Sequence, residues 1–276
     1  MRFAKMHGLG NDYIYFNCLT QTVEDPPSTA RRLADRHFGI GGDGIVLIKP
    51  SESADYGMEM YNADGSRAEM CGNAIRCVGK YLYEKGITDR KELSIETGAG
   101  ILRLWLRVTG NEVGSVRVDM GEPVLEGRKI PTVFDQPRVV NEPLEIDGKT
   151  VRVTCLSMGN PHCVVIVEKN TDDWVLGLGP KIEVHPAFPN RINAEFISVD
   201  NRRELGMRVW ERGTGETLAC GTGACAAGVA AHLNGVAERE TTVHLPGGDL
   251  QIDWAEDNHV YLTGPATFVF EGEVEI

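Results

Sequence analysis

Two cysteines stand in matching contexts that could support acid–base chemistry. The chain reads CGNAIRC from Cys71 and CGTGACA from Cys220, so each cysteine precedes a glycine and a stretch with helical character. A helix N-terminus presents unpaired N–H groups and a partial positive charge, which depress the pKa of a thiol placed there. Such a thiol can act as a base near neutral pH, and the same N–H groups can bind a carboxylate or phosphate. The two motifs therefore predict two reactive sulfurs, each beside an anion-binding helix start.

A structural role is the alternative for these cysteines, because Cys is among the most buried residue types. We favour reactivity for Cys71 and Cys220 because their contexts match, and packing for Cys18, Cys77, Cys155, Cys163 and Cys225. The chain has neither a CxxC nor an HxxxH pair, so the sequence predicts no metal site. Two matched acid–base groups favour a reaction in which one removes a proton from a carbon and the other returns a proton on the opposite face. We find no motif for pyridoxal phosphate and expect no cofactor.

The spacing of the two motifs, 220 − 71 = 149 residues, recurs elsewhere in the chain. Sliding the sequence on itself by this offset, without a gap, aligns further residues, and so many matches in one register predict an internal duplication. The matching pairs are Gly10 with Gly159, Asn11 with Asn160, Met58 with Met207, Gly79 with Gly228, Gly86 with Gly235, and Gly98 with Gly247.

The elements that must position the two cysteines can be read from hydrophobic periodicity. Residues 73–85 carry an apolar stripe at helical spacing, and 222–234 are small and apolar nearly all round, which is typical of a buried helix. A further helix is expected from near Ser28 through residue 37. Short β-branched or alternating runs predict many strands, whose sheets must bury their faces on something. These runs are 45–48, 58–61, 93–96, 101–108, 115–120, 151–156, 163–167, 195–199, 207–210, 241–245, 259–262 and 266–270.

Composition excludes several classes of function. The formal charge is −12 and no run of Lys and Arg stands out, which argues against nucleic acid and anionic membrane surfaces as partners. No apolar run approaches the ~18 residues of a membrane span, and the N-terminal residues carry no apolar core of signal-peptide length. We expect a cytoplasmic protein whose seven cysteines are mostly reduced.

Several long motifs resemble the diaminopimelate epimerase family. They are HGLGNDYIYF (7–16), NADGSRAEMCGNAIRC (62–77), GNPH (159–162), RINAEF (191–196) and ERGTGETLACGTGACA (211–226). The resemblance covers nearly the whole chain. It implies cofactor-independent interconversion of LL- and meso-diaminopimelate, in the synthesis of lysine and peptidoglycan precursors. It also implies an α+β fold with two quasi-symmetric domains, each a mixed β-sheet around a central helix, and an active site in the cleft between them.

The resemblance assigns roles to individual residues. Cys71 and Cys220 match the two catalytic bases, and His162 and Glu211 match polar residues that assist the thiols. The residues that match substrate contacts are Asn11, Asn62, Gly72, Asn73, Asn160, Asn193, Glu211, Arg212, Gly221 and Thr222. An Arg suits this substrate because its guanidinium binds a carboxylate through two hydrogen bonds. The family's strand crossover implies domains of 1–120, completed by 266–276, and 121–265.

Three positions depart from the family pattern: Gly44 where a glutamine is frequent, Arg67 where an acidic residue is usual, and Ala74 where many members have glycine. For part of the predicted site, a purely structural role also remains open. Asn160 with Pro161 could form only a turn, His162 could be a core histidine, and Glu211 with Arg212 could be a solvated pair.

Three other functions remain open. The related proline racemases share CGTG but lack the GNPH and NADGS context, a thiol redox protein would cycle a Cys71–Cys220 disulfide, and a non-catalytic protein would only bind an amino acid. Exchange of the substrate's α-proton with solvent deuterium separates an epimerase from the last two. The sequence does not fix the oligomeric state, and a homodimer is one possibility.

Overall fold

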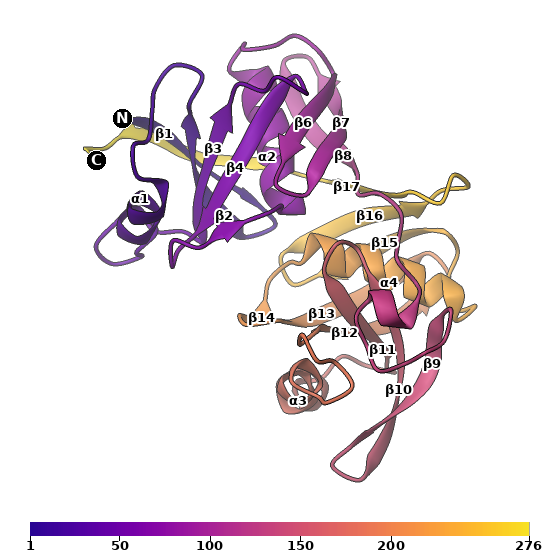
Figure 1. The fold of residues 1–276 in the computed structure, drawn as a ribbon. Coiled ribbons are helices and arrows are strands. Elements are labelled where there is room, and N and C mark those ends of the chain that lie inside the picture. Colours follow the sequence, from indigo (N-terminus) through magenta and orange to yellow (C-terminus); the bar gives the residue numbers. More distant parts are fainter. Residues whose placement is uncertain (276) are drawn as a thin grey trace. The chain divides into compact units, whose positions relative to one another are not determined.

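The structure, a computed structural model, describes residues 1–275 and divides into two compact units. Unit 1 comprises 1–119 and 263–275, and unit 2 comprises 120–262. Both combine a mixed β-sheet with few helices (Figure 1), so the predicted α+β class is confirmed. The strand β17 (Val260–Gly264) contains the point at which the chain passes from unit 2 back to unit 1.

Unit 1 is a single curved sheet with two helices. Its strands are hydrogen-bonded in the order β18–β1–β2–β3–β4–β6–β7–β8, in which only β2–β3 and β4–β6 are parallel. Because β18 pairs with β1, the two ends of the chain lie side by side (Figure 1). The elements are β1 (Arg2–Gly8), β2 (Asn11–Asn17), α1 (Pro26–Leu33), β3 (Gly44–Lys49), β4 (Tyr56–Asn62), β5 (Arg67–Ala68), α2 (Gly72–Glu84), β6 (Glu92–Thr97), β7 (Gly100–Thr109), β8 (Glu112–Asp119) and β18 (Thr267–Glu273).

Unit 2 has the corresponding order β9–β10–β11–β12–β13–β15–β16, with β11–β12 and β13–β15 parallel. A short strand, β14, pairs with β13 as β5 pairs with β4. The elements are the 3₁₀-helix η1 (Gly127–Lys129), β9 (Val139–Ile146), β10 (Lys149–Ser157), β11 (Pro161–Ile166), the π-helix η2 (Asp173–Leu178), α3 (Gly179–Glu183), β12 (Asn193–Asn201), β13 (Glu204–Glu211), β14 (Gly215–Thr217), α4 (Gly221–Leu233), β15 (Glu240–Leu245) and β16 (Gly248–Trp254).

The two units repeat each other with a constant offset from β2 and β11 to the end of the central helix. The preceding hairpins differ by one residue, because β1–β2 closes on Gly8–Asn11 and β10–β11 on Ser157–Pro161. Helix α2 begins at Gly72 and ends at Glu84, and α4 begins at Gly221 and ends at Leu233, which is an offset of 149 at both ends. The strand register agrees as well, because Tyr13 pairs with Gly44 in unit 1 and His162 pairs with Asn193 in unit 2. The duplication inferred from the sequence therefore has a structural counterpart in the strand order of each unit.

Beyond the central helix, the ungapped alignment of the sequence is wrong by one residue. The hairpin β6–β7 closes on the pair Thr97–Gly100, and β15–β16 closes on Leu245–Gly248, so the offset there is 148. The loop after α4 is one residue shorter than the loop after α2, and exposed loops tolerate such a deletion. The match of Gly98 to Gly247 is therefore a coincidence in a glycine-rich chain.

Helix α1 is shorter than the sequence predicted, because it ends at Leu33 instead of continuing to residue 37. The Asp35 carboxylate accepts hydrogen bonds of 2.7 Å from the backbone N–H groups of His37 and Phe38. An aspartate that binds backbone N–H groups in this way competes with continuation of a helix. The carbonyl group of Leu33 then accepts from Ile40 and Gly41, so the chain turns back.

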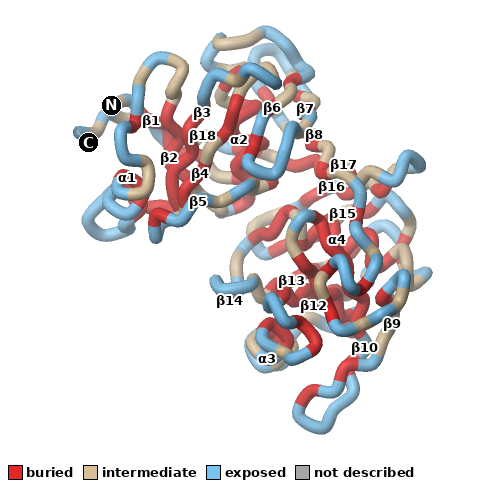
Figure 2. The backbone as a smooth tube through the Cα atoms, in the orientation of Figure 1, coloured by how far each residue is buried: buried red, intermediate tan, exposed pale blue. Residues whose placement is uncertain are grey.

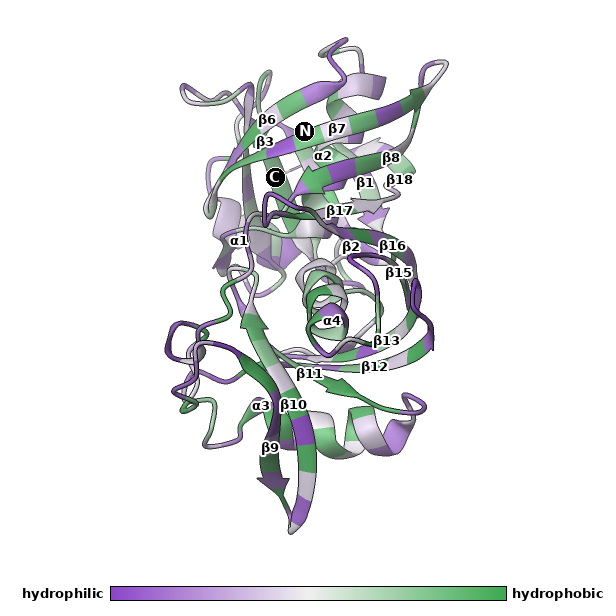
Figure 3. Ribbon diagram, turned by 90° about the vertical axis from the view of Figure 1, so that its right-hand side faces the viewer, coloured by the Kyte–Doolittle hydropathy of each residue, from purple (hydrophilic) through white to green (hydrophobic). Residues whose placement is uncertain are grey.

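The central helices are buried on nearly all sides (Figure 2). Figure 3 shows α4 enclosed by the strands β10 to β13, β15 and β16 of its own unit. Gly79 of α2 and Gly228 of α4 permit this contact, since a Cβ atom at either would lie 3.0 Å from a side chain of the sheet. Helix α2 differs from a simple amphipathic helix because Arg76 and Lys80 are also buried.

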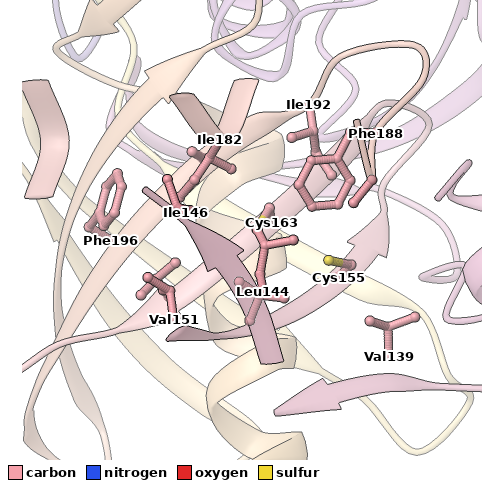
Figure 4. Packing of buried hydrophobic residues seen from close by; sticks show 14 of the residues in the cluster. Val139, Leu144, Ile146, Val151, Cys155, Cys163, Ile182, Phe188, Ile192 and Phe196 are labelled. Carbon is pink, nitrogen blue, oxygen red and sulfur yellow. The ribbon is translucent and has the colours of Figure 1, made fainter. Parts of the chain in front are cut away.

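Each unit also has an apolar core outside its central helix. In unit 1 it joins α1 to β1, β2 and β3 around Phe16 and Ile45. In unit 2 it lies on the other face of β10, β11 and β12, with Cys155 and Cys163 among the apolar side chains (Figure 4). Burial of one large apolar side chain contributes about 1.5–3 kcal/mol, so these clusters stabilise the strands that carry the site residues. No helix in the described part of the chain is long and apolar enough to cross a membrane.

Candidate active site

Cys71 is the N-cap residue of α2. Its extended backbone (φ −141°, ψ 120°) precedes the first helical turn, and its carbonyl group accepts from the N–H group of Ile75 at 3.0 Å. The Cys71 Sγ atom lies 3.2 Å from Oδ1 of Asn11, the residue at the start of β2, and donates to it. The predicted position of this thiol at a helix start is therefore correct.

A chain of amide and guanidinium groups supports the Cys71 thiol. Asn73 donates to the same Asn11 oxygen at 3.2 Å. Its own Oδ1 accepts from the Arg76 guanidinium at 3.0 Å, and Arg76 also donates to the Gly72 carbonyl at 2.8 Å. The Arg76 side chain is fully buried, so a positive charge is held inside the first turns of α2. The sequence-predicted residues Asn11, Gly72 and Asn73 thus belong to one connected network.

The outer part of this network consists of two carboxylates, Asp12 and Asp43, that form ion pairs with Arg36 and Lys5. The Asn11 amide donates to Asp43 at 2.6 Å, and Arg36 bridges Asp43 and Asp12 at 3.0 and 2.7 Å. Lys5, which is buried, also pairs with Asp12 at 2.6 Å. Burial raises the pKa of Asp12, but Arg36 and Lys5 outweigh it, so that the net pKa is lowered. The Asn11 side chain is therefore held at both ends: its amide group by Asp43, and its oxygen by Cys71 and Asn73.

The remaining sequence-predicted positions of unit 1 are less connected. Asn62 donates to Ser66 within its own turn at 3.0 Å. Gly44, where the family often has glutamine, has no room for a side chain, because a Cβ atom there would lie 2.0 Å from the Tyr61 carbonyl oxygen. Arg67 is exposed and lies 3.4 Å from Glu59, and Ala74 is fully buried in α2.

Cys220 is the N-cap residue of α4 and is the counterpart of Cys71. Its Sγ atom accepts from the Gly223 N–H group at 3.3 Å and lies 3.6 Å from the Thr222 hydroxyl group. Burial raises the pKa of the Cys220 thiol well above its usual value, and the nearby carboxylates of Glu211 and Glu195 raise it further. The expectation of a depressed pKa at this helix start is therefore wrong for Cys220, because burial and negative charge outweigh the helix N-terminus.

Glu211, at the end of β13, is the carboxylate associated with this thiol. Its pKa is raised, first by burial and then by the charge of Glu195, while hydrogen bonding to Thr217 and Cys220 acts in the opposite direction. Thr217 donates to Glu211 Oε1. Glu211 makes no ion pair with Arg212 among the described residues: Glu211 accepts from Thr217, whereas the Arg212 side chain is exposed.

His162 is a fully buried histidine with a polar partner on each ring nitrogen. Its Nδ1 atom lies 2.7 Å from Glu195 Oε1, and its Nε2 atom lies 2.9 Å from Asn160 Oδ1. Asn160 belongs to the tight turn between β10 and β11, as the structural alternative predicted. Its side chain also contacts His162. The sequence analysis missed Glu195, although a carboxylate inside the apolar strand of RINAEF was a signal for it.

Asn193, which lies opposite His162 in the pairing of β11 with β12, is brought together with Arg212. Asn193 Oδ1 accepts from the backbone N–H group of Arg212 at 2.8 Å. The Arg212 side chain is exposed and donates to the Asn190 carbonyl at 3.3 Å. Glu183, which the sequence did not single out, fixes this region because it accepts from Trp210 and Gly213 at 2.8 and 2.9 Å.

The other cysteines lie in packing positions. Cys77 and Cys225 are buried inside α2 and α4, Cys155 and Cys163 face each other across β10 and β11, and all seven cysteines are free thiols. Burial raises the pKa of Cys77 to about 11, which makes it a poor base at neutral pH. No group of three or more His, Cys, Asp or Glu residues in the described chain is placed to hold a metal ion.

Solved structures of low sequence identity share this fold. A phenazine biosynthesis protein of the PhzF family from Bacillus anthracis superposes with a TM-score of 0.71 at 18% identity, over 100% of this chain and 99% of that one. A probable proline racemase from Agrobacterium radiobacter superposes with a TM-score of 0.70 at 15% identity, over 100% and 93%. At these identities the likeness establishes the fold alone.

Sequence relatives are much closer. The diaminopimelate epimerase of Acetivibrio thermocellus is 61% identical over 100% of this chain and 99% of its own, and that of Moorella thermoacetica is 55% identical over 99% of both. The family described as diaminopimelate epimerase matches residues 3–126 and 154–269. The first matched range contains the Cys71 motif and the second contains the Cys220 motif. The chain therefore belongs to the diaminopimelate epimerases, a family of isomerases.

Proposed function

We propose that this protein interconverts LL- and meso-diaminopimelate without a cofactor, using Cys71 and Cys220 on opposite faces of one α-carbon. The observation that carries the proposal is the equivalence of the two thiols, since each is the N-cap residue of the central helix in units with the same strand order. Diaminopimelate enters the proposal from the family. In this role the enzyme would serve the synthesis of lysine and peptidoglycan precursors in the cytoplasm.

The proposed reaction moves one proton off the substrate and one proton onto it. The thiolate of one cysteine takes the α-proton, and the electron pair of the broken C–H bond stays on the α-carbon. The thiol of the other cysteine gives its proton to the opposite face and is left as a thiolate. The net result is an inverted centre and two sulfurs that have exchanged protonation states, so the same groups serve the reverse direction with their roles exchanged.

The surroundings of Cys220 favour one of the two roles, that of proton donor, for this thiol. Burial and two carboxylates raise the pKa of Cys220, which favours the protonated form and hence the role of proton donor. We propose that Cys71 supplies the thiolate in the reaction, after it loses the proton that its thiol donates to Asn11 Oδ1 in the free protein. The N–H groups at the starts of α2 and α4, including those of Gly72, Asn73, Gly221 and Thr222, would bind the α-carboxylate, whose charge increases during proton removal.

The non-reacting end of the substrate is a second amino-acid moiety, and the site needs groups that bind it. We propose that Arg212 binds its carboxylate, because the guanidinium is exposed and has only a long contact of 3.3 Å to give up. Asn193 holds the backbone of Arg212 in place, and Asn11, Asn62 and Asn160 supply further amides. A homodimer remains part of the proposal, and sedimentation equilibrium tests it.

The test is exchange of the α-proton in deuterium oxide. Purified protein is incubated with LL-diaminopimelate, and deuterium at the α-carbon and the ratio of stereoisomers are followed by nuclear magnetic resonance. We expect deuterium in the meso product and no exchange with proline or lysine. Exchange with proline at a comparable rate would instead favour the racemase alternative. Absence of exchange with every substrate would leave a redox or binding protein.

A further inference from the structure

Glu195, the buried carboxylate that contacts His162, has no assigned role in the cysteine chemistry. The parallel pairing of β11 with β12 sets His162 opposite Asn193 and Val164 opposite Glu195, so the two side chains come from adjacent strands. Both are fully buried, and Nδ1 lies 2.7 Å from Glu195 Oε1. A carboxylate can only accept a hydrogen bond in this contact, so Nδ1 carries the hydrogen and donates it.

The other ring nitrogen has a partner of a different kind. Nε2 lies 2.9 Å from the side-chain amide of Asn160. This amide can accept from a protonated Nε2 and, after a half-turn, donate to an unprotonated one. The ring can therefore gain or lose a proton at Nε2 and keep a hydrogen bond in both states, while the bond from Nδ1 to Glu195 stays the same.

Packing holds Glu195 in this position. A Cβ atom on Gly223, in the first turn of α4, would lie 2.9 Å from Glu195 Oε1 and 3.1 Å from Met207 Cε, so the carboxylate fills the space that the glycine leaves. The second oxygen, Oε2, is buried and has no hydrogen-bond partner within the described residues. Burial of a carboxylate with one oxygen unpaired is costly, and an apolar side chain in the same space would avoid that cost. This arrangement favours a role beyond packing.

We infer that Glu195 is a positioning residue, which fixes the Nδ1–H tautomer of His162 so that proton exchange at the imidazole takes place at Nε2. For its kinetic consequence the inference rests on the proposed function. The tautomer itself is a property of the free protein and can be measured without substrate.

The decisive variant is Glu195→Met, which keeps the length of the side chain and removes the acceptor. The ring is observed by nuclear magnetic resonance of isotope-labelled histidine, and His162→Gln identifies its signals. In the wild type we expect hydrogen on Nδ1, and in Glu195→Met we expect the Nε2–H form of the neutral ring to become populated. We also expect a decrease in kcat of about 100-fold with KM changed by less than about threefold, because Glu195 contacts no proposed substrate group.

Rescue separates positioning from packing. Glu195→Gln restores an acceptor oxygen without a charge and should recover at least about tenfold in kcat over Glu195→Met, together with the Nδ1–H signal. The matched control is Glu204→Met, which makes the same change at the exposed pair of His244 and Glu204, 2.6 Å apart, and should leave kcat and the His162 signals unchanged. A folded Glu195→Met variant with an unchanged tautomer, or with kcat within about twofold of the wild type, overturns the inference.

A second perturbation covers the case in which Glu195→Met does not fold. Gly223→Ala keeps the carboxylate and places a methyl group 2.9 Å from its Oε1 atom, so we expect the same tautomer shift in weaker form. An unchanged His162 signal in folded Gly223→Ala would count against the inference. A wild-type protein without α-proton exchange would refute the proposed function, and the tautomer measurement would still decide whether Glu195 fixes the ring.

Discussion

The two helix starts have the same backbone and opposite surroundings. At α2, the thiol of Cys71 faces an amide network that ends on the buried guanidinium of Arg76. At α4, the position of Arg76 is taken by Cys225, and the buried charges near Cys220 are the carboxylates of Glu195 and Glu211. The backbone geometry of a duplicated motif has thus been kept while the charge around it has diverged.

This contrast teaches that a helix N-terminus does not by itself set the pKa of a thiol. The effect of the helix end is modest, whereas burial and a nearby carboxylate can each shift a pKa by more than one unit. In the proposed reaction one sulfur must hold a proton while the other accepts one, and the raised pKa of Cys220 favours the first of these roles for that thiol.

The largest expected effect comes from removing either thiol. Cys71→Ala and Cys220→Ala should each reduce epimerisation by at least about 10⁴-fold, because one face of the carbon then lacks its acid or base. The assay is conversion of LL-diaminopimelate to the meso form. Cys77→Ala and Cys225→Ala, deeper in the same helices, are the controls and should keep activity while losing about 1–2 kcal/mol of stability. Full activity of a Cys71 or Cys220 variant would refute the two-base proposal.

The next largest effect tests the role of the buried positive charge, Arg76, at the start of α2. Arg76→Cys places the unit 2 residue into unit 1 and removes the buried side-chain donor to the Gly72 carbonyl and to Asn73 Oδ1. Each such loss costs about 1–3 kcal/mol, so we expect the free energy of unfolding to fall by at least about 2 kcal/mol. Urea denaturation measures it, with exposed Arg107→Ala as the control that should change stability by less than about 0.5 kcal/mol. Equal stability of the two variants would mean that Arg76 does not hold the start of α2.

A third variant tests the effect of a buried negative charge, Glu211, on the pKa of Cys220. Glu211→Gln removes the carboxylate that, after burial, contributes most to the raised pKa of Cys220, so this pKa should fall towards its usual value while burial keeps it elevated. Thiolate absorbance against pH, compared with the same titration of Glu211→Gln/Cys220→Ser, isolates Cys220. Exposed Glu216→Gln is the control. A rise in the Cys220 pKa would contradict the assigned cause.

Glu211 should also affect the pH dependence of stability. Its folded-state pKa is raised, so the folded protein binds a proton more strongly than the unfolded chain does. Wild-type stability, relative to Glu211→Gln, should therefore be highest below the unfolded pKa of about 4.3 and should decline as pH rises through the folded value. Urea midpoints of both proteins across this range measure the difference, and a relative gain in wild-type stability with rising pH would show the opposite sign.

The smallest effect concerns the exposed histidine pair. His244 lies between Glu204 and Asp249 at 2.6 and 2.8 Å, and these carboxylates raise its pKa, with Asp249 the larger cause. The raised pKa adds stability that is complete below the unfolded value of about 6.5 and is lost as pH rises through the folded value. Because the pair is partly exposed, His244→Gln should cost at most about 1 kcal/mol at low pH and nothing measurable at high pH. A larger cost at high pH would mean that packing, and not charge, holds His244.

Sequence periodicity located the elements that depend on local signals. Helices α2 and α4 begin and end within one residue of the predicted ranges, since an apolar pattern at helical spacing and a glycine after the last turn are local features. Helix α1 was overextended because the Asp35 turn that ends it uses side-chain hydrogen bonds that periodicity does not record. The one-residue change of offset after the helices is visible only in the pairing of the strands.

The sequence by itself determined the family, the duplication and the placement of each reactive cysteine before a glycine at a helix start, because these are properties of short segments and their spacing. The tertiary structure decided which charges surround each cysteine. Arg76 and Glu195 read as an ordinary helix residue and an ordinary strand residue, and both are fully buried. Their burial follows from sheet strands that close around the central helix from far along the chain, and that burial determines how strongly a charge acts on a thiol.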